Sequence, residues 1–285
     1  MTAQEKLHIE KDSVQETLVI PLYAREMCNK HFPELFTDSR SSELINRIDY
    51  DFSKEAAKAD SLPMRFGTLE IAARQMDLLT EVQEYLKAHP TAAVVNLGCG
   101  LDQTGEATDN GTCKIYNIDF PDVIAIRRQL TPETDRIQNI GCDLTDTSWF
   151  DQIDDEGGSI FFASGVFYYI ATDQIRALIN AMAERFTNGR LAFDAGGSFA
   201  IKLMLKTWIK ESGIQNIETF FHINTIEEDV TPWLRHADVS AKKYMMGYSD
   251  LKVKSVSGLF RLMARVVDGG LNMRIYRFDF HGIEK

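Results

Sequence analysis

The spacing of apolar residues along the chain has two patterns. From about Ser13 to Lys58 they recur at helical spacing with several interruptions, and Thr68 to Ala88 carries a longer apolar stripe on one helical face. From Ala92 onward, short and nearly continuous apolar runs alternate with helical patterns. Such runs, bounded by turn residues, are typical of buried strands. The pattern therefore predicts a helical N-terminal part followed by a region of alternating strands and helices.

Five of the apolar runs are predicted to be strands of one sheet. They cover residues 92–97, 114–119, 136–143, 159–163 and 190–194. The intervening helices have recognisable starts, because Pro121 opens a helix at 122–130 and Thr172 caps the next one. Strands that alternate with helices are typical of a doubly wound parallel sheet. The expected fold class is therefore α/β.

The alternation of strands and helices is less regular after Gly196-Gly197. There we expect helices and strands at 199–210, 226–236, 239–246, 258–267 and 272–280, of which 239–246 and 272–280 are the strands. Two late strands joined through a helix would complete a seven-stranded sheet. The expected division is an N-terminal helical cap over residues 1–66 and a core over 67–285, with a lid-like helical insertion around 198–236.

Composition narrows the class of protein. The chain has 285 residues, 44% hydrophobic and 26% charged, which is ordinary for a soluble globular protein. Its formal net charge of -11 argues against a nucleic-acid partner, because phosphate binding needs clustered Lys and Arg. No apolar run approaches the ~18–20 residues of a membrane span, and Met1 to Lys11 lacks an apolar signal core. We expect a cytoplasmic protein that binds neither nucleic acid nor membrane; its oligomeric state stays open.

The cysteines and histidines do not indicate a metal site. Cys28, Cys99, Cys113 and Cys142 form no Cys-x-x-Cys pair, and the histidines are scattered without a ligand spacing. We expect free thiols and no protein-bound metal.

The first expected strand ends in the turn Gly98-Cys99-Gly100. Glycines after a strand let backbone N–H groups come close to a ligand. A dinucleotide-binding turn needs a third glycine where Gln103 stands, and Asp102 would repel a pyrophosphate. A cationic sulfonium with an amino-acid tail tolerates acidic surroundings better. The turn therefore favours S-adenosylmethionine over a dinucleotide.

Acidic residues end the next two strands. Asp119 stands where an acid commonly accepts hydrogen bonds from ribose hydroxyls, and Asp143 can face an adenine amino group while Leu144 packs on the base. Each aspartate could equally be a helix cap. Arg74 lies on or beside the apolar stripe of its helix and so needs a carboxylate partner. That partner could be structural, such as Asp102, or a ligand carboxylate.

Several stretches resemble one known family. Residues 96–102 (Asn-Leu-Gly-Cys-Gly-Leu-Asp), 16–25, 48–54, 71–74 and 119–123 are similar to bacterial members of the leucine carboxyl methyltransferase family, which includes tetracenomycin-type polyketide O-methyltransferases. The resemblance covers roughly Glu16 to Phe280. It implies a class I methyltransferase fold, Rossmann-like, with a seven-stranded sheet whose last strand is antiparallel, and S-adenosylmethionine as the methyl donor.

The resemblance also implies roles for single residues. Arg74 would hold the donor's carboxylate, Gly98, Cys99 and Gly100 would line its methionine part, and the nucleoside would lie against Asp119, Phe120, Asp143 and Leu144. Two departures stand out. Gln103-Thr104 replaces Thr-Arg, and Ser164, also expected at the donor site, replaces a carboxylate that approaches the donor.

The implied function is O-methylation of a hydroxyl or carboxylate on a small molecule, in secondary, polyketide-like metabolism. A non-catalytic donor-binding member and a methyltransferase acting on a protein C-terminus are the alternatives, while Gln103 disfavours a nicotinamide-dependent oxidoreductase. No catalytic residue is identified; Tyr23, Tyr168 and His222 are only candidate bases for a phenol. Acceptor specificity is expected in the N-terminal helices and in residues 199–236.

Overall fold

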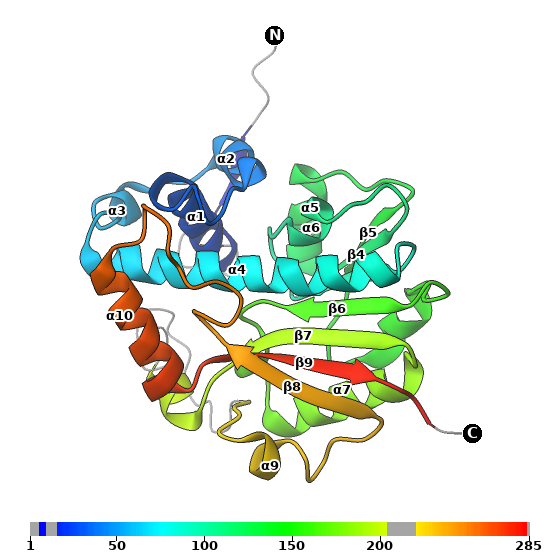
Figure 1. The fold of residues 1–285 in the computed structure, drawn as a ribbon. Coiled ribbons are helices and arrows are strands. Elements are labelled where there is room, and N and C mark those ends of the chain that lie inside the picture. The colour runs from blue at the N-terminus through cyan, green and yellow to red at the C-terminus, as the bar shows by residue number, and fades with distance from the viewer. Residues whose placement is uncertain (1–5, 10–15, 204–220, 284–285) are drawn as a thin grey trace.

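A seven-stranded sheet forms the centre of the fold. The computed structural model describes residues 6–9, 16–203 and 221–283, and its main sheet has the strand order β5-β4-β3-β6-β7-β9-β8 (Figure 1). The strands are β3 (Ala93–Leu97), β4 (Lys114–Asp119), β5 (Ile137–Gly141), β6 (Ser159–Ala163), β7 (Gly189–Ala195), β8 (Ala237–Lys243) and β9 (Arg274–Phe280). All neighbouring pairs are parallel except those of β9, which is antiparallel to β7 and β8. The predicted sheet, with its last strand antiparallel, is confirmed.

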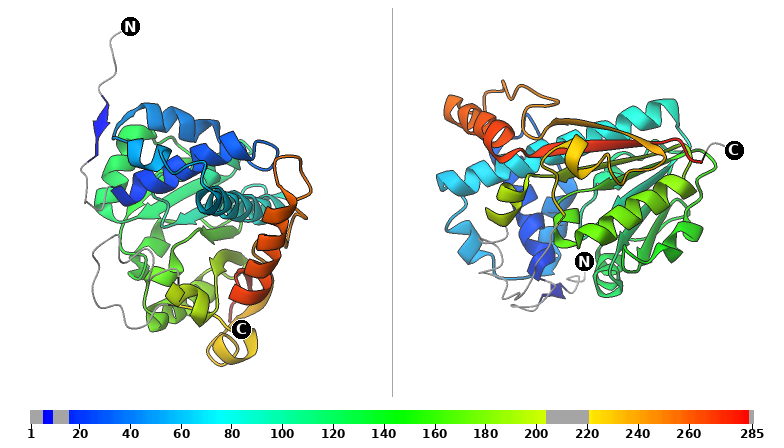
Figure 2. Two further views of the ribbon diagram at one scale, coloured as in Figure 1. Left: turned by 90° about the vertical axis from the view of Figure 1, so that its left-hand side faces the viewer. Right: turned by 90° about the horizontal axis from the view of Figure 1, so that it is seen from below.

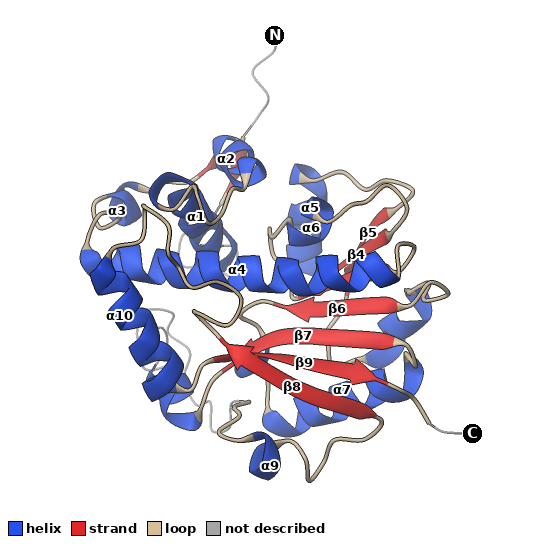
Figure 3. Ribbon diagram, viewed as in Figure 1, coloured by secondary structure: helices blue, strands red, loops and turns tan. Residues whose placement is uncertain are grey.

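Helices lie along the sheet and beyond its edges (Figure 3). They are α1 (Glu16–His31), α2 (Ser39–Asn46), α3 (Ser53–Ala56), α4 (Leu62–Ala88), α5 (Thr104–Ala107), α6 (Pro121–Leu130), α7 (Thr172–Arg185), α9 (Ile226–Asp229) and α10 (Gly258–Val266), with 3-10 turns at Thr147–Gln152 and Phe167–Tyr169 and a π-helical turn at Val267–Leu271. The helix α4 runs past the carboxyl ends of β6 and β7 toward α10 (Figure 1). Its N-terminal half therefore projects over the edge of the sheet where ligands bind in open α/β folds.

The apolar runs divide between the two faces of the sheet. In β3, Val95 and Leu97 belong to one buried cluster with Ile179 of α7, while Val94 belongs to a second cluster with Leu78 of α4. Successive strand residues point to opposite faces, so a strand covered on both faces is apolar at every position. This is why the predicted strands appear in the sequence as continuous apolar runs.

The N-terminal helices cover the carboxyl edge at β3 and β4. Leu18 and Leu22 of α1 share a buried cluster with Leu101, which follows the glycine turn, and with Val123 and Ile126 of α6. Figure 2 shows α1 to α3 toward the same end of the molecule as the N-terminal half of α4. A short parallel pair, β1 (Leu7–His8) with β2 (Ile48–Asp49), adds to this region and was not predicted.

Two elements differ from the prediction, and a third is described only in part. Helix α4 begins at Leu62, so Gly67 lies inside it, and a Cβ at Gly67 would meet nothing within 4 Å. The helix expected at 226–236 ends after one turn, at Asp229. Residues 198–203 are helical, which agrees with the first part of the helix expected at 199–210. Residues 204–220 lie outside the described residues. Most of the lid-like insertion around 198–236 and the domain boundaries therefore stay predictions.

Within the described ranges, no helix is both long and apolar enough to cross a membrane. The same residues contain no group of three or more His, Cys, Asp or Glu side chains arranged to hold a metal ion.

Candidate functional site

The glycine turn after β3 has a backbone that only glycine adopts easily. Gly98 and Gly100 have φ angles of 67° and 47°. The N–H groups of Gly98 and Cys99 both donate to the carbonyl of Ile118, at 2.8 and 3.0 Å. A Cβ at Gly98 would lie 2.6 Å from Cγ2 of Val166. The turn is thus clamped between β4 and the loop after β6, and position 98 has no room for a side chain.

Asp119 ends β4 directly beside this turn. Its Oδ2 accepts the N–H of Gly100 and its Oδ1 accepts the N–H of Phe120, both at 2.8 Å. Burial raises the pKa of Asp119, although these hydrogen bonds oppose the rise. An ionised carboxylate has about four acceptor positions, so both oxygens can accept further donors, such as ribose hydroxyls. Phe120 is 54% exposed and offers an apolar surface next to that position.

Asp143 and Leu144 follow β5 and have local structural roles. Oδ1 of Asp143 accepts the backbone N–H and the hydroxyl of Thr145, each at 2.8 Å, so this exposed aspartate stabilises a turn. Leu144 is buried, and its carbonyl accepts the indole N–H of Trp149 at 3.2 Å. Contact of either residue with an adenine stays a prediction.

Arg74 has a carboxylate partner, but it is not Asp102. Its Nη1 donates to Oδ2 of Asp194 at 3.3 Å, and the N–H of Gly165 donates to Oδ1 of the same carboxylate at 2.6 Å. Asp194 lies in β7, next to its carboxyl end, and was not singled out in the sequence. Nε of Arg74 is buried without a hydrogen-bond partner. The guanidinium therefore keeps unsatisfied donor capacity that a second carboxylate could use.

Asp102 is buried and interacts with side chains of α1 and α4, so it is not a free charge beside the turn. Its Oδ1 lies 3.0 Å from Nη1 of Arg25 and accepts Nε2 of Gln75 at 2.7 Å and the N–H of Thr104 at 2.9 Å. The ion pair with Arg25 compensates its charge, so the expected repulsion of a pyrophosphate does not apply. The argument against a dinucleotide then rests on Gln103, where a third glycine would be needed.

Arg127 supports the turn from inside the protein and was missed in the sequence. This fully buried side chain donates from Nη1 to the carbonyls of Gly100 and Asp102, at 2.9 and 2.7 Å, and from Nη2 to Glu106 Oε1 at 2.5 Å. The sequence does contain a signal for this residue. Arg127 shares one face of α6 with residues 123, 126 and 130, which are all apolar. An arginine in that stripe predicts a buried ion pair.

Ser164 and the aromatic residues after β6 lie beside Arg74. The Ser164 hydroxyl donates to Oε1 of Gln75 at 3.2 Å. A Cβ at Gly165 would lie 2.9 Å from both Nη1 of Arg74 and the hydroxyl of Tyr168. Burial raises the pKa of Tyr168 well above its usual value.

Burial raises the pKa of a second candidate base as well. Burial, followed by the charge of Glu55, raises the pKa of Tyr23. The shifts favour the protonated hydroxyl of Tyr23 and Tyr168, which can donate a hydrogen bond; a role of either as a base stays a prediction.

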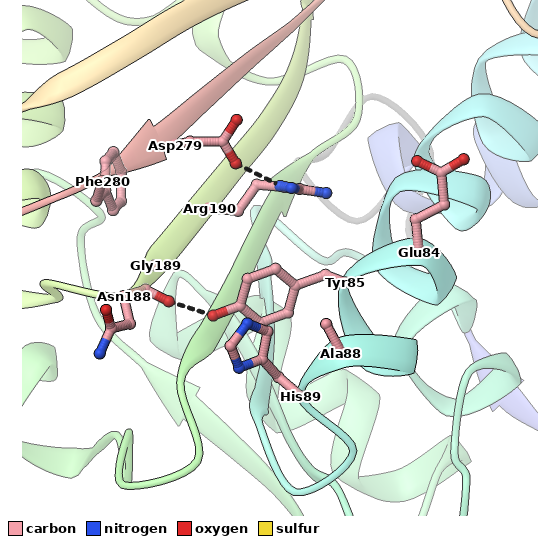
Figure 4. A pocket seen from close by; sticks show the side chains of 9 residues that line it. All are labelled: Glu84, Tyr85, Ala88, His89, Asn188, Gly189, Arg190, Asp279 and Phe280. Carbon is pink, nitrogen blue, oxygen red and sulfur yellow. Dashed lines mark hydrogen bonds and ion pairs between the residues drawn. The ribbon is translucent and has the colours of Figure 1, made fainter.

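A hollow of about 240 Å³ lies at the opposite edge of the sheet (Figure 4). It is lined by the end of α4, the start of β7 and the end of β9, namely Glu84, Tyr85, Ala88, His89, Asn188, Gly189, Arg190, Asp279 and Phe280. Its polar groups largely pair with each other, as Nε of Arg190 donates to Oδ1 of Asp279 at 2.7 Å. None of the expected donor-binding residues lines this hollow.

The comparisons with known proteins agree with this geometry. Residues 3–183 match the family described as leucine carboxyl methyltransferase. The chain belongs to the leucine carboxyl methyltransferase family. The predicted family is therefore confirmed.

Two relatives are similar over much of the chain. The tetracenomycin polyketide synthesis O-methyltransferase TcmP of Streptomyces glaucescens is 32% identical over 183 residues, which cover 64% of this chain and 66% of TcmP. The chain thus spans just under two thirds of the length of that relative. The S-adenosyl-L-methionine-dependent methyltransferase dpfgK of Gibberella zeae is 24% identical over 220 residues, which cover 70% of this chain and 73% of dpfgK.

Solved structures share the fold at low identity. A DUF574-family protein of Streptomyces avermitilis has a TM-score of 0.58 at 12% identity, covering 90% of this chain and 96% of its own. A chain from the complex of the Trm112 methyltransferase activator with a methyltransferase of Haloferax volcanii has a TM-score of 0.52 at 15% identity, covering 80% and 98%. Together with the strand order, these likenesses confirm the class I methyltransferase fold.

Proposed function

We propose that the protein transfers the methyl group of S-adenosylmethionine to an oxygen atom of a small molecule. One observation carries this proposal: in a member of a methyltransferase family, Asp119 binds the glycine turn through the N–H of Gly100, and Arg74 lies beside Gly165 in the loop after β6 that also packs on Gly98. The names of TcmP, an O-methyltransferase of polyketide synthesis, and dpfgK, an S-adenosylmethionine-dependent methyltransferase, support it.

The residues present fit this donor. The buried, unpartnered Nε of Arg74 suits a ligand carboxylate, and the unbranched backbone of Gly98, Cys99 and Gly100 suits close approach of the methionine part. The remaining acceptor positions of Asp119 suit the ribose. We assign Phe120, Asp143 and Leu144 to the adenine and Ser164 to the wall beside the methionine part.

The bound donor would supply an electrophilic methyl group on a sulfonium. The protein then has to orient the acceptor oxygen in line and exclude water. A carboxylate acceptor needs no base, whereas a phenol benefits from one. The protonated hydroxyl of Tyr168 can orient the acceptor oxygen, and the exposed rings of Tyr169 and Phe199, which follow β6 and β7, offer an apolar surface for its carbon skeleton.

Titration calorimetry with S-adenosylmethionine and S-adenosylhomocysteine tests donor binding. We expect dissociation constants in the micromolar range, and Asp119→Asn should weaken binding by roughly ten-fold or more through lost charge-assisted hydrogen bonds. Asp122→Asn, an exposed carboxylate on the first turn of α6, is the matched control and should leave binding unchanged. Absence of binding to the unaltered protein would refute the proposal.

Acceptor turnover is measured with labelled donor in a metabolite extract. Labelled small molecules that resist mild base would indicate methyl ethers, and base-labile ones would indicate methyl esters. Label on protein C-termini instead would support the alternative of a protein carboxyl methyltransferase, and donor binding without any transfer would support a non-catalytic role.

We also propose a cytoplasmic location and the division into a cap over residues 1–66 and a core over 67–285. The first rests on the four cysteines, which are all free thiols, as is usual in a reducing compartment. The second is supported by the buried cluster through which the N-terminal helices contact Leu101 and α6.

A further inference from the structure

A second charged side chain, Glu70, lies one helical turn before Arg74 on α4. Residues four apart on a helix project from the same face. Glu70 is partly buried, and within the described part of the chain no hydrogen bond or ion pair holds its carboxylate. Arg74 is bonded through Nη1 to Asp194, while its buried Nε has no partner. Two opposite charges therefore lie on one helical face and interact, but no hydrogen bond or ion pair joins them directly.

The surroundings of Glu70 make this arrangement costly without a ligand. Burial raises the pKa of Glu70 to about 7, against the lowering effect of the Arg74 charge. Tyr244, which follows β8, interacts electrostatically with both Glu70 and Arg74, and burial raises its own pKa. It is therefore a neutral neighbour. A partly desolvated carboxylate loses hydration, and among the described residues only the nearby charge of Arg74 offsets this loss.

The other side chains near Arg74 have less capacity to accept a cation. Asp194 is 1% exposed, and its charge is already paired with the guanidinium of Arg74, so a second cation would have little access to it. Ser164 carries no charge, and its hydroxyl donates to Gln75. Glu70 is the acid beside Arg74 whose oxygens remain available.

We propose that Glu70 binds the α-ammonium group of the methyl donor while Arg74 binds its α-carboxylate. This inference rests on the proposed function and specifies one part of the donor site. An amino-acid zwitterion carries both charges on a single carbon, and the two side chains project from one helical face. Each ligand charge would meet a charged partner, which gives stronger hydrogen bonds than neutral groups give.

The test compares three nucleosides that differ only at the amino-acid end. S-Adenosylhomocysteine carries both charged groups, its deamino analogue lacks the ammonium, and 5′-methylthioadenosine lacks both. Dissociation constants are measured by calorimetry for the unaltered protein, for Glu70→Gln and for Glu84→Gln. Glu84 is an exposed glutamate on the same helix, fourteen residues or roughly 21 Å further along the axis, so it is the matched control.

We expect Glu70→Gln to weaken S-adenosylhomocysteine binding by roughly ten-fold while leaving both other nucleosides within about two-fold. Glu84→Gln should change none of the three. Equal weakening of S-adenosylhomocysteine and its deamino analogue, or no weakening of either, would overturn the assignment of Glu70. Failure of all three nucleosides to bind the unaltered protein would overturn the proposed function as well, so the two failures are distinguishable.

The pH dependence of binding gives an independent readout. Protonation removes the charge of Glu70, so S-adenosylhomocysteine affinity should fall as the pH is lowered through about 7. Among the described residues, Arg74 and Tyr244 are the titratable groups that interact with Glu70, and both keep one protonation state in this pH range. Glu70→Gln should flatten the profile, and an unchanged profile in that variant would contradict the assignment.

Discussion

The substitution Gly98→Ala tests how the glycine turn after β3 is built. Its φ of 67° is left-handed, which costs a residue with a Cβ about 1–2 kcal/mol. The new Cβ would also stand 2.6 Å from Cγ2 and 2.8 Å from Cγ1 of Val166, and overpacking of this kind costs about 1–3 kcal/mol. The two contributions predict a loss of about 2–5 kcal/mol in the free energy of unfolding.

Urea unfolding followed by circular dichroism measures this loss, with Gly67→Ala as the control. Gly67 lies inside α4 with nothing within 4 Å of its Cβ position, so alanine there should stabilise by about 0.5–1 kcal/mol. In a Val166→Ala background, Gly98→Ala should become less costly by about 1–3 kcal/mol, because the steric part is relieved and the backbone part stays. A loss below about 0.5 kcal/mol, or no relief from Val166→Ala, would refute the reasoning.

Two further predictions concern buried charges. Arg127→Met should cost about 3–5 kcal/mol in urea unfolding, because it leaves Glu106 buried without its cation. Arg128→Met should cost about 1 kcal/mol or less, because its ion pair with Glu133 is accessible to solvent. Equal losses would contradict the buried role of Arg127. Burial together with the nearby charge of Asp268 raises the pKa of Asp77 to about 9. The folded protein then binds a proton that the unfolded chain releases above its ordinary pKa, so Asp77 lowers stability as the pH rises from about 4 to about 9. Asp77→Asn, which mimics the protonated form, should therefore be more stabilising relative to the unaltered protein at pH 8 than at pH 5; a difference independent of pH in the same unfolding assay would contradict this.

Much of the fold could be predicted because its signals are local. Strand β4 was predicted with the bounds it has in the structure, and β3 within one residue, since both are short apolar runs ended by a glycine turn or an aspartate. Pro121 opens α6, as predicted. Thr172 was predicted to cap α7, but it is the first residue of that helix and Ala171 stands at the N-cap position. The prediction of one helix at 226–236 was wrong. Its apolar residues do pack against the core, but those after α9, including Trp233, do so from turns.

The candidate site could be predicted only in part. Asp119 lies beside Gly100, as the strand order of a doubly wound sheet requires. The partner of Arg74 could not be found in this way, because Asp194 lies 120 positions further along the chain. Asp102 was misjudged for the same reason, since its charge is compensated by Arg25 of α1.

The alternation of strands and helices, the glycine turn at Gly98 to Gly100 and the acid at the end of β4 can be predicted from the amino-acid sequence. These features depend on backbone preference and on hydrophobic periodicity, which act over a few residues. The pairing of charges depends on the folded structure, which brings together Arg74 and Asp194, Arg25 and Asp102, and Arg127 and Glu106. Ion pairs are set by the positions of side chains in space, and periodicity along the chain contains no information about which distant residues become neighbours.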